Sequence, residues 1–328
     1  MTLSFACAAP ASAQDACSFF ADKTVELIVP FNAGGGYDVY GRLVAKHMGK
    51  ELGANAMIVV NRPGAGGLLA TNQTFHAPPD GLLVQLVPIS GIVAAELGGA
   101  EGVLFKSREF SWIGRVSSEP DAVVVAPESE ITSLEDVQKI GATRKVRIGS
   151  TGLGSPQYIS IKLLADFIQT DSDVVTGFST AAEIFPSLVR GEVDLFVSSL
   201  SAAETAEKAE AARILWTFGS QGLPDRPEVK PLSEVIDAAF HPINEVHDNA
   251  ITAGRAIAAP PGMPAERLEC MREAFDRAMA SEGLLSEAAA LNRPVNPLSG
   301  DELTTLVGKA TEGLPQEYLD ILTTSFAR

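Results

Sequence analysis

Short runs of β-branched and apolar residues alternate with longer segments of helical periodicity along most of the chain. The strand-like runs span residues 24–29, 56–60, 82–87, 122–126, 145–148, 174–178, 193–197 and 214–218. Helical patterns follow most of them, and a long one begins at Ala265. Because strands that alternate with helices form parallel sheets, the pattern predicts an α/β fold whose ligands bind outside the carboxyl ends of the strands.

The first strand ends in a glycine-rich turn, Val29–Asp38, that runs directly into a helical pattern. Three consecutive glycines let the backbone approach a ligand closely, and the free N–H groups of a helix start supply donors and partial positive charge. A tight turn between strand and helix is common in α/β folds, so this segment alone does not identify a site. A second turn of the same design covers residues 149–156, with Ser155 at the cap position and Pro156 in the first helical turn. The pair predicts an anion site with two sides.

A length of 328 residues allows about two domains. The strand-like segment 122–126 is a candidate for the crossing from the first domain to the second. The run 254–259, which lies between Pro- and Gly-rich segments, is a candidate for the return crossing. We therefore expect a first domain formed by residues 22–125 and 252–328, and a second domain formed by residues 126–251.

Residues 1–13 are rich in alanine and end in Ala11-Ser12-Ala13, a small-x-small pattern that signal peptidase prefers before its cut. The segment lacks a basic start and its apolar core is short, so we interpret it as the remnant of a longer signal peptide on an exported protein. A frayed terminus is the alternative. No later segment approaches about 18 uninterrupted apolar residues, so no transmembrane helix is expected.

Three cysteines occur: Cys7, Cys17 and Cys270. Cleavage after Ala13 would leave Cys17 and Cys270, and an oxidising compartment permits such residues to pair, although the sequence does not decide whether they do. No C-x-x-C motif is present, and the four histidines show no zinc-site spacing. We therefore expect neither a metal site nor a cofactor.

Charge and composition exclude several classes of protein. The chain has 25 Lys and Arg against 41 Asp and Glu, a net charge of 25 − 41 = −16, which excludes a broad surface for nucleic acid or anionic membranes. None of the glycine turns carries the lysine of a P-loop or a complete Gly-x-Gly-x-x-Gly, and no Gly-x-Ser-x-Gly elbow occurs. The sequence therefore offers no motif in support of catalysis, although an α/β enzyme acting on an organic acid stays open as an alternative to a binding protein.

Seven short motifs occur in order along the chain. They are Pro30–Asp38 (PFNAGGGYD), Asn61–Gly67 (NRPGAGG), Pro79–Gly81 (PDG), Gly149–Ser155 (GSTGLGS), Arg190–Asp194 (RGEVD), Leu223–Pro227 (LPDRP) and Ala259–Pro264 (APPGMP). Each motif is weak by itself. As a set they resemble the substrate-binding proteins of tripartite tricarboxylate transporters, known as the Bug or TctC family, and the resemblance covers the chain from about residue 23 to the end.

The resemblance implies a periplasmic, monomeric receptor with two Rossmann-like α/β domains joined by two crossing hinge strands, the type II periplasmic binding protein fold. Such a receptor closes over a small organic carboxylate and delivers it to permease subunits in the membrane; a receptor that reports to a signalling protein is the alternative. The ligand-binding residues predicted on this basis are Phe31, Asn32, Ala33, Gly34, Gly35, Tyr37, Asp38, Ser150, Thr151, Gly154, Ser155, Tyr158, Thr180, Ser198 and Arg255. Asp38 is expected to organise its loop, because its carboxylate would repel an anionic ligand.

Three of these positions depart from the usual pattern of the family: Tyr37, Tyr158 and Arg255. We hypothesise that Arg255 binds a second carboxylate, because a guanidinium fork holds such a group bidentately. The alternative is a surface arginine paired with a neighbouring acid. Tyr37 and Tyr158, as walls of the pocket, would favour an aromatic or longer-chain acid. A dicarboxylate or an aromatic carboxylate is therefore the expected ligand.

Overall fold

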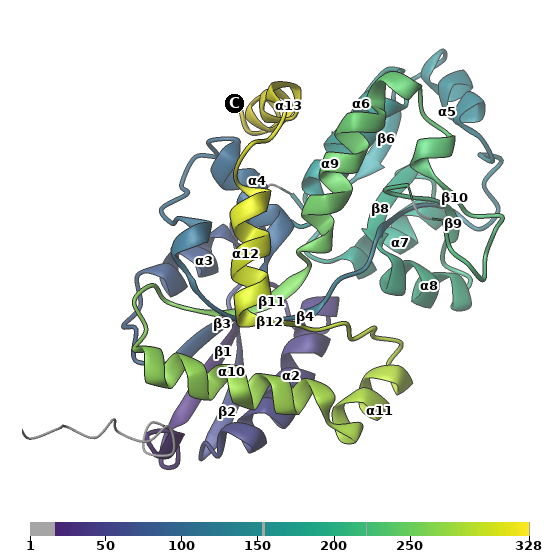
Figure 1. Cartoon of the computed structure of the whole chain (residues 1–328). Coiled ribbons are helices and arrows are strands. Elements are labelled where there is room, and N and C mark those ends of the chain that lie inside the picture. The colour runs from purple at the N-terminus through teal and green to yellow at the C-terminus, as the bar shows by residue number, and fades with distance from the viewer. Residues whose placement is uncertain (1–16, 153–154, 221, 328) are drawn as a thin grey trace, which may run out of the picture.

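The computed structural model describes residues 17–152, 155–220 and 222–327. The residues interpreted as a signal peptide, together with Cys7 and Gly154, lie outside this part of the chain. The described residues form two α/β domains, each built on a six-stranded sheet (Figure 1), which confirms the predicted two-domain fold. None of their helices is long and apolar enough to cross a membrane.

The first domain contains a sheet with the strand order β12-β4-β11-β3-β1-β2. Its strands are β1 (Thr24–Val29), β2 (Ala56–Asn61), β3 (Leu83–Pro88), β4 (Ser111–Ser117), β11 (Arg255–Ala259) and β12 (Leu298–Ser299). Its helices are α2 (Gly36–Leu52), α3 (Leu68–Phe75), α4 (Ile89–Leu97), α10 (Ala265–Ala280), α11 (Glu282–Ala290) and α12 (Gly300–Ala310). β1 runs parallel to β2 and β3, as predicted, whereas β11 is antiparallel to β3 because it enters the sheet from the other domain.

The second domain contains a sheet with the strand order β10-β9-β5-β8-β6-β7. Its strands are β5 (Asp121–Val125), β6 (Val146–Gly149), β7 (Ser172–Val175), β8 (Leu195–Ser199), β9 (Arg213–Thr217) and β10 (Lys230–Pro231). Its helices are α5 (Leu134–Gly141), α6 (Tyr158–Phe167), α7 (Ala181–Val189), α8 (Leu200–Lys208) and α9 (His241–Thr252). β6 is parallel to β7 and β8, and β5 is antiparallel to β8 and β9, so both sheets are mixed.

The chain passes between the two sheets in extended segments. Residues 118–120 lead from β4 to β5, so the outward crossing lies a few residues before the boundary predicted at residue 125. β5 is buried along its whole length between β8 and β9, which is why this apolar run belongs to the second sheet and not to the linker. The return passes through residues 253–254 into β11, the strand expected for it.

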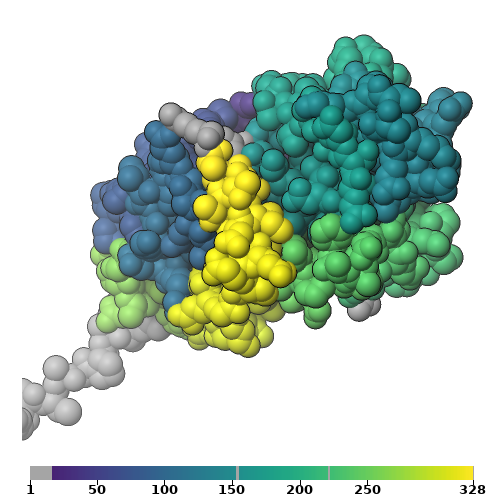
Figure 2. All heavy atoms as spheres, turned by 90° about the horizontal axis from the view of Figure 1, so that it is seen from above, coloured from purple at the N-terminus to yellow at the C-terminus, as the bar shows by residue number. Residues whose placement is uncertain are grey.

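The C-terminal helix forms a third connection between the domains. α13 (Gln316–Phe326), which was expected to belong to the first domain, packs against α4 of that domain and against α6 and α9 of the second. Its Tyr318 and Leu322 are buried in the same apolar cluster as Ile161 and Leu164 of α6. Figure 2 shows the C-terminal residues, in yellow, along the line where the two domains meet.

The strand β4 is the main element that the sequence pattern hides. Trp112, Ile113 and Val116 are buried, but Arg115 interrupts the apolar run. The Arg115 guanidinium donates to the carbonyls of Thr252 at 2.8 Å and Asn296 at 2.9 Å, so its polar atoms are satisfied within the fold. A strand buried on both faces with a charged residue inside it lacks the alternation from which strands are predicted.

The helix α2, which follows the first glycine-rich turn, packs closely against the strand β1, which precedes it. A Cβ atom at Gly41 would lie 2.5 Å from Cγ2 of Val29, so only glycine lets the helix lie directly on the strand. α2 then ends at Gly53, whose φ of 69° places it in the left-handed region. The turn before the helix is therefore held at both ends by regular structure.

A disulfide bond fastens the start of the described chain to the first domain. Cys17 and Cys270 of α10 are bonded, with their Cα atoms 5.5 Å apart and a sequence separation of 253 residues. The sequence left this pairing open. Since closing a long loop restricts the unfolded chain strongly, such a bond contributes about 2–5 kcal/mol to stability.

Candidate ligand-binding cleft

The loop after β1 is fixed by one buried carboxylate, that of Asp38 in the first turn of α2. Its Oδ2 accepts hydrogen bonds from Gly34 N–H and Arg42 Nε, both at 2.9 Å. Its Oδ1 accepts from Asn61 Nδ2 and Arg42 Nη2, both at 3.0 Å, and Asn61 also donates to the Phe31 carbonyl. Gly34 has a φ of 85°, which glycine adopts without strain. Asp38 thus organises the loop, in the role expected for it.

Asp38 remains ionised at neutral pH. Burial raises the pKa of Asp38, but the hydrogen bonds from Arg42, Gly34 and Asn61 outweigh burial and hold the pKa below its ordinary value. No side chain caps the start of α2 at Gly35. The N–H groups at the helix start are therefore open to a ligand, and Gly35 and Tyr37 line a cleft.

The matching loop after β6 lies in the second domain. Ser150 is buried; its N–H donates to the Val175 carbonyl at 2.8 Å, and its Oγ accepts from Gly152 N–H at 3.1 Å. Ser155 is buried too, and its Oγ has no hydrogen-bond partner among the described residues. Thr151 and Pro156 are the described residues of this turn that line the cleft, and Ser150 and Ser155 do not line it.

A cleft of about 410 Å³ lies between the two domains. The predicted residues on its lining are Phe31, Asn32, Gly34, Gly35, Tyr37, Thr151, Thr180, Ser198 and Arg255. The predicted residues that lie outside this lining are Ala33, Asp38, Ser150, Ser155 and Tyr158. The structure thus brings the glycine-rich turn of the first domain together with hydroxyl groups of the second.

Tyr158 faces away from the cleft, toward the C-terminal helix. Its hydroxyl donates to the Ser325 carbonyl at 3.0 Å, and its ring lies 5.6 Å from that of Phe326, centroid to centroid. The expectation that Tyr158 walls the pocket is therefore wrong. α6 begins at this residue, and the packing of α13 on α6 takes up its side chain.

An apolar part of the lining was not recognised in the sequence. We call it the apolar chamber; it is formed by Ala182, Phe185, Pro186, Phe196, Ala202, Ala206, Ala209 and Ala211. The rings of Phe185 and Phe196 meet edge to face with centroids 5.6 Å apart. The alanines of residues 202–212 were the available signal, but small residues on a helix are equally typical of ordinary packing.

Arg255, at the start of β11, is buried and already paired. Its Nη1 lies 2.7 Å from Oε1 of Glu119 and donates to Ser117 Oγ at 3.1 Å. Its guanidinium lies 5.3 Å from the ring centroid of Tyr37 and 5.0 Å from that of Tyr40. Arg255 is therefore paired with a neighbouring acid, as in the alternative to the second-carboxylate hypothesis, but the pair is buried and does not lie on the surface. A ligand carboxylate would compete with Glu119 for it.

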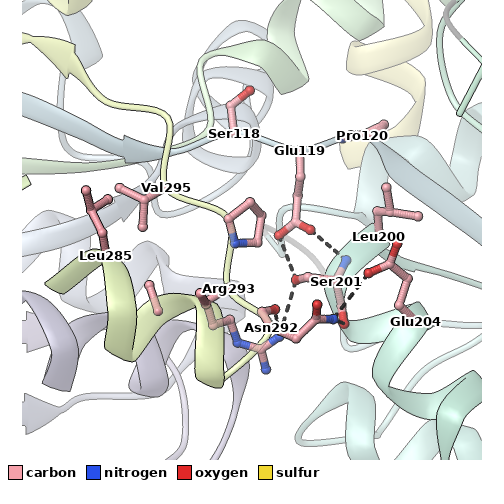
Figure 3. A pocket seen from close by; sticks show the side chains of 13 residues that line it. Ser118, Glu119, Pro120, Leu200, Ser201, Glu204, Leu285, Asn292, Arg293 and Val295 are labelled. Carbon is pink, nitrogen blue, oxygen red and sulfur yellow. Dashed lines mark hydrogen bonds between the residues drawn. The ribbon is translucent and has the colours of Figure 1, made fainter. Parts of the chain in front are cut away.

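Glu119 lies in the outward crossing segment and links the two domains. In addition to Arg255, its carboxylate accepts hydrogen bonds from Ser201 N–H at 2.6 Å and Ser201 Oγ at 3.0 Å, at the start of α8. Figure 3 shows Glu119 pointing at Ser201 above the loop of Asn292 and Arg293, beside a cavity of about 610 Å³. The hinge region is thus bridged by hydrogen bonds as well as by the backbone.

A chain of buried polar side chains leads from the cleft to the C-terminal helix. Gln157, which lines the cleft, donates to Asp121 Oδ1 at 2.9 Å, and Ser160 Oγ donates to Asp121 Oδ2 at 2.6 Å. Because Ser160 donates its hydroxyl proton to Asp121, its Oγ accepts a hydrogen bond from His247 Nε2, 2.8 Å away. His247 Nδ1 then accepts from the Tyr318 hydroxyl at 3.0 Å.

Burial sets the pKa values in this chain. Burial raises the pKa of Asp121 to about 6, although the bonds from Ser160 and Gln157 and the charge of Arg255 oppose it. Burial also lowers the pKa of His247 to about 3. At neutral pH the chain therefore holds a neutral histidine and a carboxylate close to its titration range.

The charge of the lining differs from that of the whole protein. The described residues of the lining include two arginines, Arg255 and Arg293, and no Asp, Glu, His or Lys. No group of three or more His, Cys, Asp or Glu side chains in the described part of the chain is placed to hold a metal ion. The cleft is thus suited to a small anion with an apolar part.

Three solved structures share this arrangement of domains. MatC from Rhodopseudomonas palustris with bound malate has a TM-score of 0.76 and 22% identity, and covers 92% of this chain and 99% of its own. The periplasmic binding protein BugD has a TM-score of 0.76 and 18% identity over 92% and 97%. An R. palustris protein with adipate has a TM-score of 0.74 and 20% identity over 92% and 97%. The fold is therefore that of the type II periplasmic binding proteins.

Residues 40–299 match the family described as the tripartite tricarboxylate transporter family receptor. A UPF0065 protein from the tcbD-tcbE intergenic region of Pseudomonas sp. strain P51 is 25% identical over 264 residues, 80% of this chain and 75% of that protein. BugT of Bordetella pertussis is 29% identical over 159 residues, 48% of this chain and 47% of BugT. The chain belongs to the tripartite tricarboxylate transporter receptor family, which confirms the resemblance and the prediction of a binding protein rather than an enzyme.

Proposed function

We propose that this protein captures a small organic carboxylate in the cleft between its domains. The observation that carries the proposal is the charge of the cleft. In a chain with a net charge of −16, the described residues of the lining include two arginines and no acidic side chain. The uncapped start of α2 adds N–H donors beside them. An anion is the ligand that such donors stabilise.

In this proposal the carboxylate lies between the glycine-rich turn of the first domain and the hydroxyl groups of the second. Asn32, Gly34 and Gly35 line the cleft from one side, and Thr151 and Ser198 from the other. Thr180 adds a third hydroxyl group of the second domain. Because both domains supply donors, the ligand binds the closed arrangement better than an open one and shifts the population toward it.

The rest of the ligand occupies the apolar chamber. Burial of apolar surface stabilises a complex by about 25 cal/mol per Å², so a chamber lined by Phe185, Phe196 and alanines favours an acid with an aromatic ring or an alkyl chain. The malate bound by MatC and the adipate bound by the second R. palustris protein support an organic acid as the ligand. A dicarboxylate or an aromatic carboxylate is the class that we propose.

We further propose that the loaded receptor works as a periplasmic monomer and delivers its ligand to permease subunits of a tripartite tricarboxylate transporter. Membership in the receptor family of these transporters supports the partner. The bond between Cys17 and Cys270 supports an oxidising compartment such as the periplasm.

A thermal-shift screen of the whole protein against monocarboxylates, dicarboxylates and aromatic carboxylates tests the proposal. A ligand at one hundred times its Kd is expected to stabilise the folded state by about 2.7 kcal/mol, with no product formed. Thr151→Val is expected to weaken binding by about three- to tenfold through the loss of a hydrogen bond. Thr143→Val, at an exposed position outside the cleft, is the matched control. A screen without any carboxylate ligand would contradict the proposal.

A further inference from the structure

Arg293 is the second arginine of the cleft, and it comes from a part of the chain that the sequence did not connect with the site. It lies in the loop between α11 and β12, on the first-domain side of the hinge. Its side chain lines both the cleft and the hinge-side cavity drawn in Figure 3. Arg293 therefore lies where the cleft adjoins the cavity lined by the crossing residues 118–120.

The charge of Arg293 has no acidic partner among the described residues. Its Nη1 donates to Ser201 Oγ at 3.3 Å and to the Asn292 carbonyl at 3.4 Å, both uncharged oxygens. Its Nε is buried and has no hydrogen-bond partner in the described part of the chain. A guanidinium with an unused donor in a buried position is an incomplete anion site.

The acidic residues that line the hinge-side cavity together with Arg293 are Glu119 and Glu204, and both accept hydrogen bonds from other residues. Glu119 accepts from Ser201 N–H and Oγ and pairs with Arg255 at 2.7 Å. Glu204 accepts from Asn292 Nδ2 at 3.2 Å. The Nε of Arg255 is likewise buried without a hydrogen-bond partner among the described residues, so the two arginines of the cleft differ in their charge: Arg255 is paired with a carboxylate of the protein, and Arg293 is not.

We propose that Arg293 binds a second anionic group of the ligand, so that the protein selects dicarboxylates over monocarboxylates. This inference rests on the proposed function, in which the glycine-rich turn and the hydroxyl groups hold the first carboxylate. The guanidinium fork suits a carboxylate because it offers two parallel N–H donors, and the ligand supplies the negative charge that the protein does not. In this proposal Arg293, and not Arg255 as hypothesised from the sequence, binds the second carboxylate of the ligand.

The test is titration calorimetry with straight-chain dicarboxylates from succinate to suberate and with the monocarboxylates of the same lengths. The wild-type protein is expected to bind at least one dicarboxylate about tenfold or more tightly than the matched monocarboxylate, the range of one charge-assisted interaction. Arg293→Gln is expected to reduce this preference to within about twofold, because it lowers the affinity for the dicarboxylate far more than that for the matched monocarboxylate. Arg293→Lys, which keeps the charge without the fork, is expected to retain part of it.

Arg277→Gln, at a half-exposed position on α10, is the matched control and is expected to keep the wild-type preference. If Arg293→Gln does not fold, Arg293→Lys alone decides, since an undiminished preference in it would overturn the inference. Equal binding of both series by the wild-type protein, or a preference that survives Arg293→Gln, would overturn the role of Arg293 and leave the proposed function intact. Binding of neither series by the wild-type protein, together with a thermal-shift screen that finds no carboxylate ligand, would overturn both.

Discussion

Each side of the cleft is supported by a buried aspartate, and the two aspartates differ in the groups that stabilise their charge. Asp38 in the first domain is neutralised by Arg42 and accepts from Asn61 and Gly34, so its pKa lies below the ordinary value. Among the described residues, the Asp121 carboxylate of the second domain accepts hydrogen bonds from the uncharged donors Ser160 and Gln157 alone, and burial raises its pKa to about 6.

The difference shows which side responds to conditions. On the first side, Asp38 stays ionised over the physiological pH range, so the loop that it organises does not change with pH. The second side holds a carboxylate near its titration range, connected through Ser160 and His247 to Tyr318 on the C-terminal helix. We therefore expect damage to the first side to abolish the cleft, and changes on the second side to alter its pH response.

The largest effect is expected from Asp38→Ala. Removing the carboxylate leaves Gly34 N–H, Asn61 and Arg42 without their shared acceptor, so the free energy of unfolding should fall by about 3 kcal/mol. Ligand binding should fall as well, because the glycine-rich turn loses its anchor. Chemical denaturation followed by circular dichroism measures the first quantity. A variant with wild-type stability would contradict the role of Asp38.

A smaller effect, visible only as a pH dependence, is expected from Asp121→Asn. The folded-state pKa of about 6 exceeds the ordinary value of 3.8, so the stabilising contribution of protonated Asp121 is full at low pH and is lost as pH rises from about 4 to 6. Two pKa units correspond to about 3 kcal/mol. His247, with its pKa lowered to about 3, acts in the opposite direction, since its contribution is lost as pH falls below about 6.5.

The two contributions largely cancel in the wild-type protein. Asp121→Asn removes one of them, so the loss of stability between pH 7 and pH 4 should become about 2–3 kcal/mol larger than in the wild type. Unfolding curves recorded at both pH values measure this difference. Parallel pH profiles for the two proteins would show that Asp121 does not titrate as its burial implies.

These aspartates also mark how far the sequence allows prediction. Asp38 was expected to organise its loop because it belongs to the glycine-rich motif and its carboxylate would repel an anionic ligand. Asp121 was not, because its partners Gln157 and Ser160 are distant in sequence and only the fold brings them to the start of β5. The α/β alternation predicted β1, β2 and β6 closely, whereas β4 was hidden by Arg115.

The same limit applies to the arginines. Arg255 was proposed as a ligand partner because a guanidinium fork suits a carboxylate in an otherwise acidic chain, but its acidic partner Glu119 is 136 positions earlier in the sequence (255 − 119). Arg293 gave no signal, since a lone arginine in a loop is most often a surface residue. Pairing and burial, which depend on the whole fold, separate the two.

Tyr318→Phe is expected to have a smaller effect on stability than the two aspartate substitutions. His247 Nδ1 would lose its donor in a buried place, and the free energy of unfolding should fall by about 1–2 kcal/mol. Tyr158→Phe, which removes one bond to the Ser325 carbonyl, is the comparison within the same helix contact. Differential scanning calorimetry measures both. A Tyr318→Phe variant as stable as the wild type would show that the polar chain ends at His247.

The smallest effect is expected from Arg42→Gln. The Arg42 side chain is 58% exposed while that of Asp38 is 5% exposed, so water and the remaining donors can compensate for the lost ion pair. Stability and binding should stay within experimental error of the wild type by the same denaturation and titration measurements. A loss as large as that of Asp38→Ala would show that the guanidinium, and not the backbone and Asn61 donors, holds the loop.

The central claim is that the cleft binds its ligand through a negative charge. It is tested most directly by titration calorimetry of the wild-type protein with the best acid from the screen and with the primary amide of that acid, at one pH and ionic strength. The amide keeps the shape and loses the charge, so its affinity is expected to be at least about tenfold lower. Equal affinity for the acid and the amide would contradict the account.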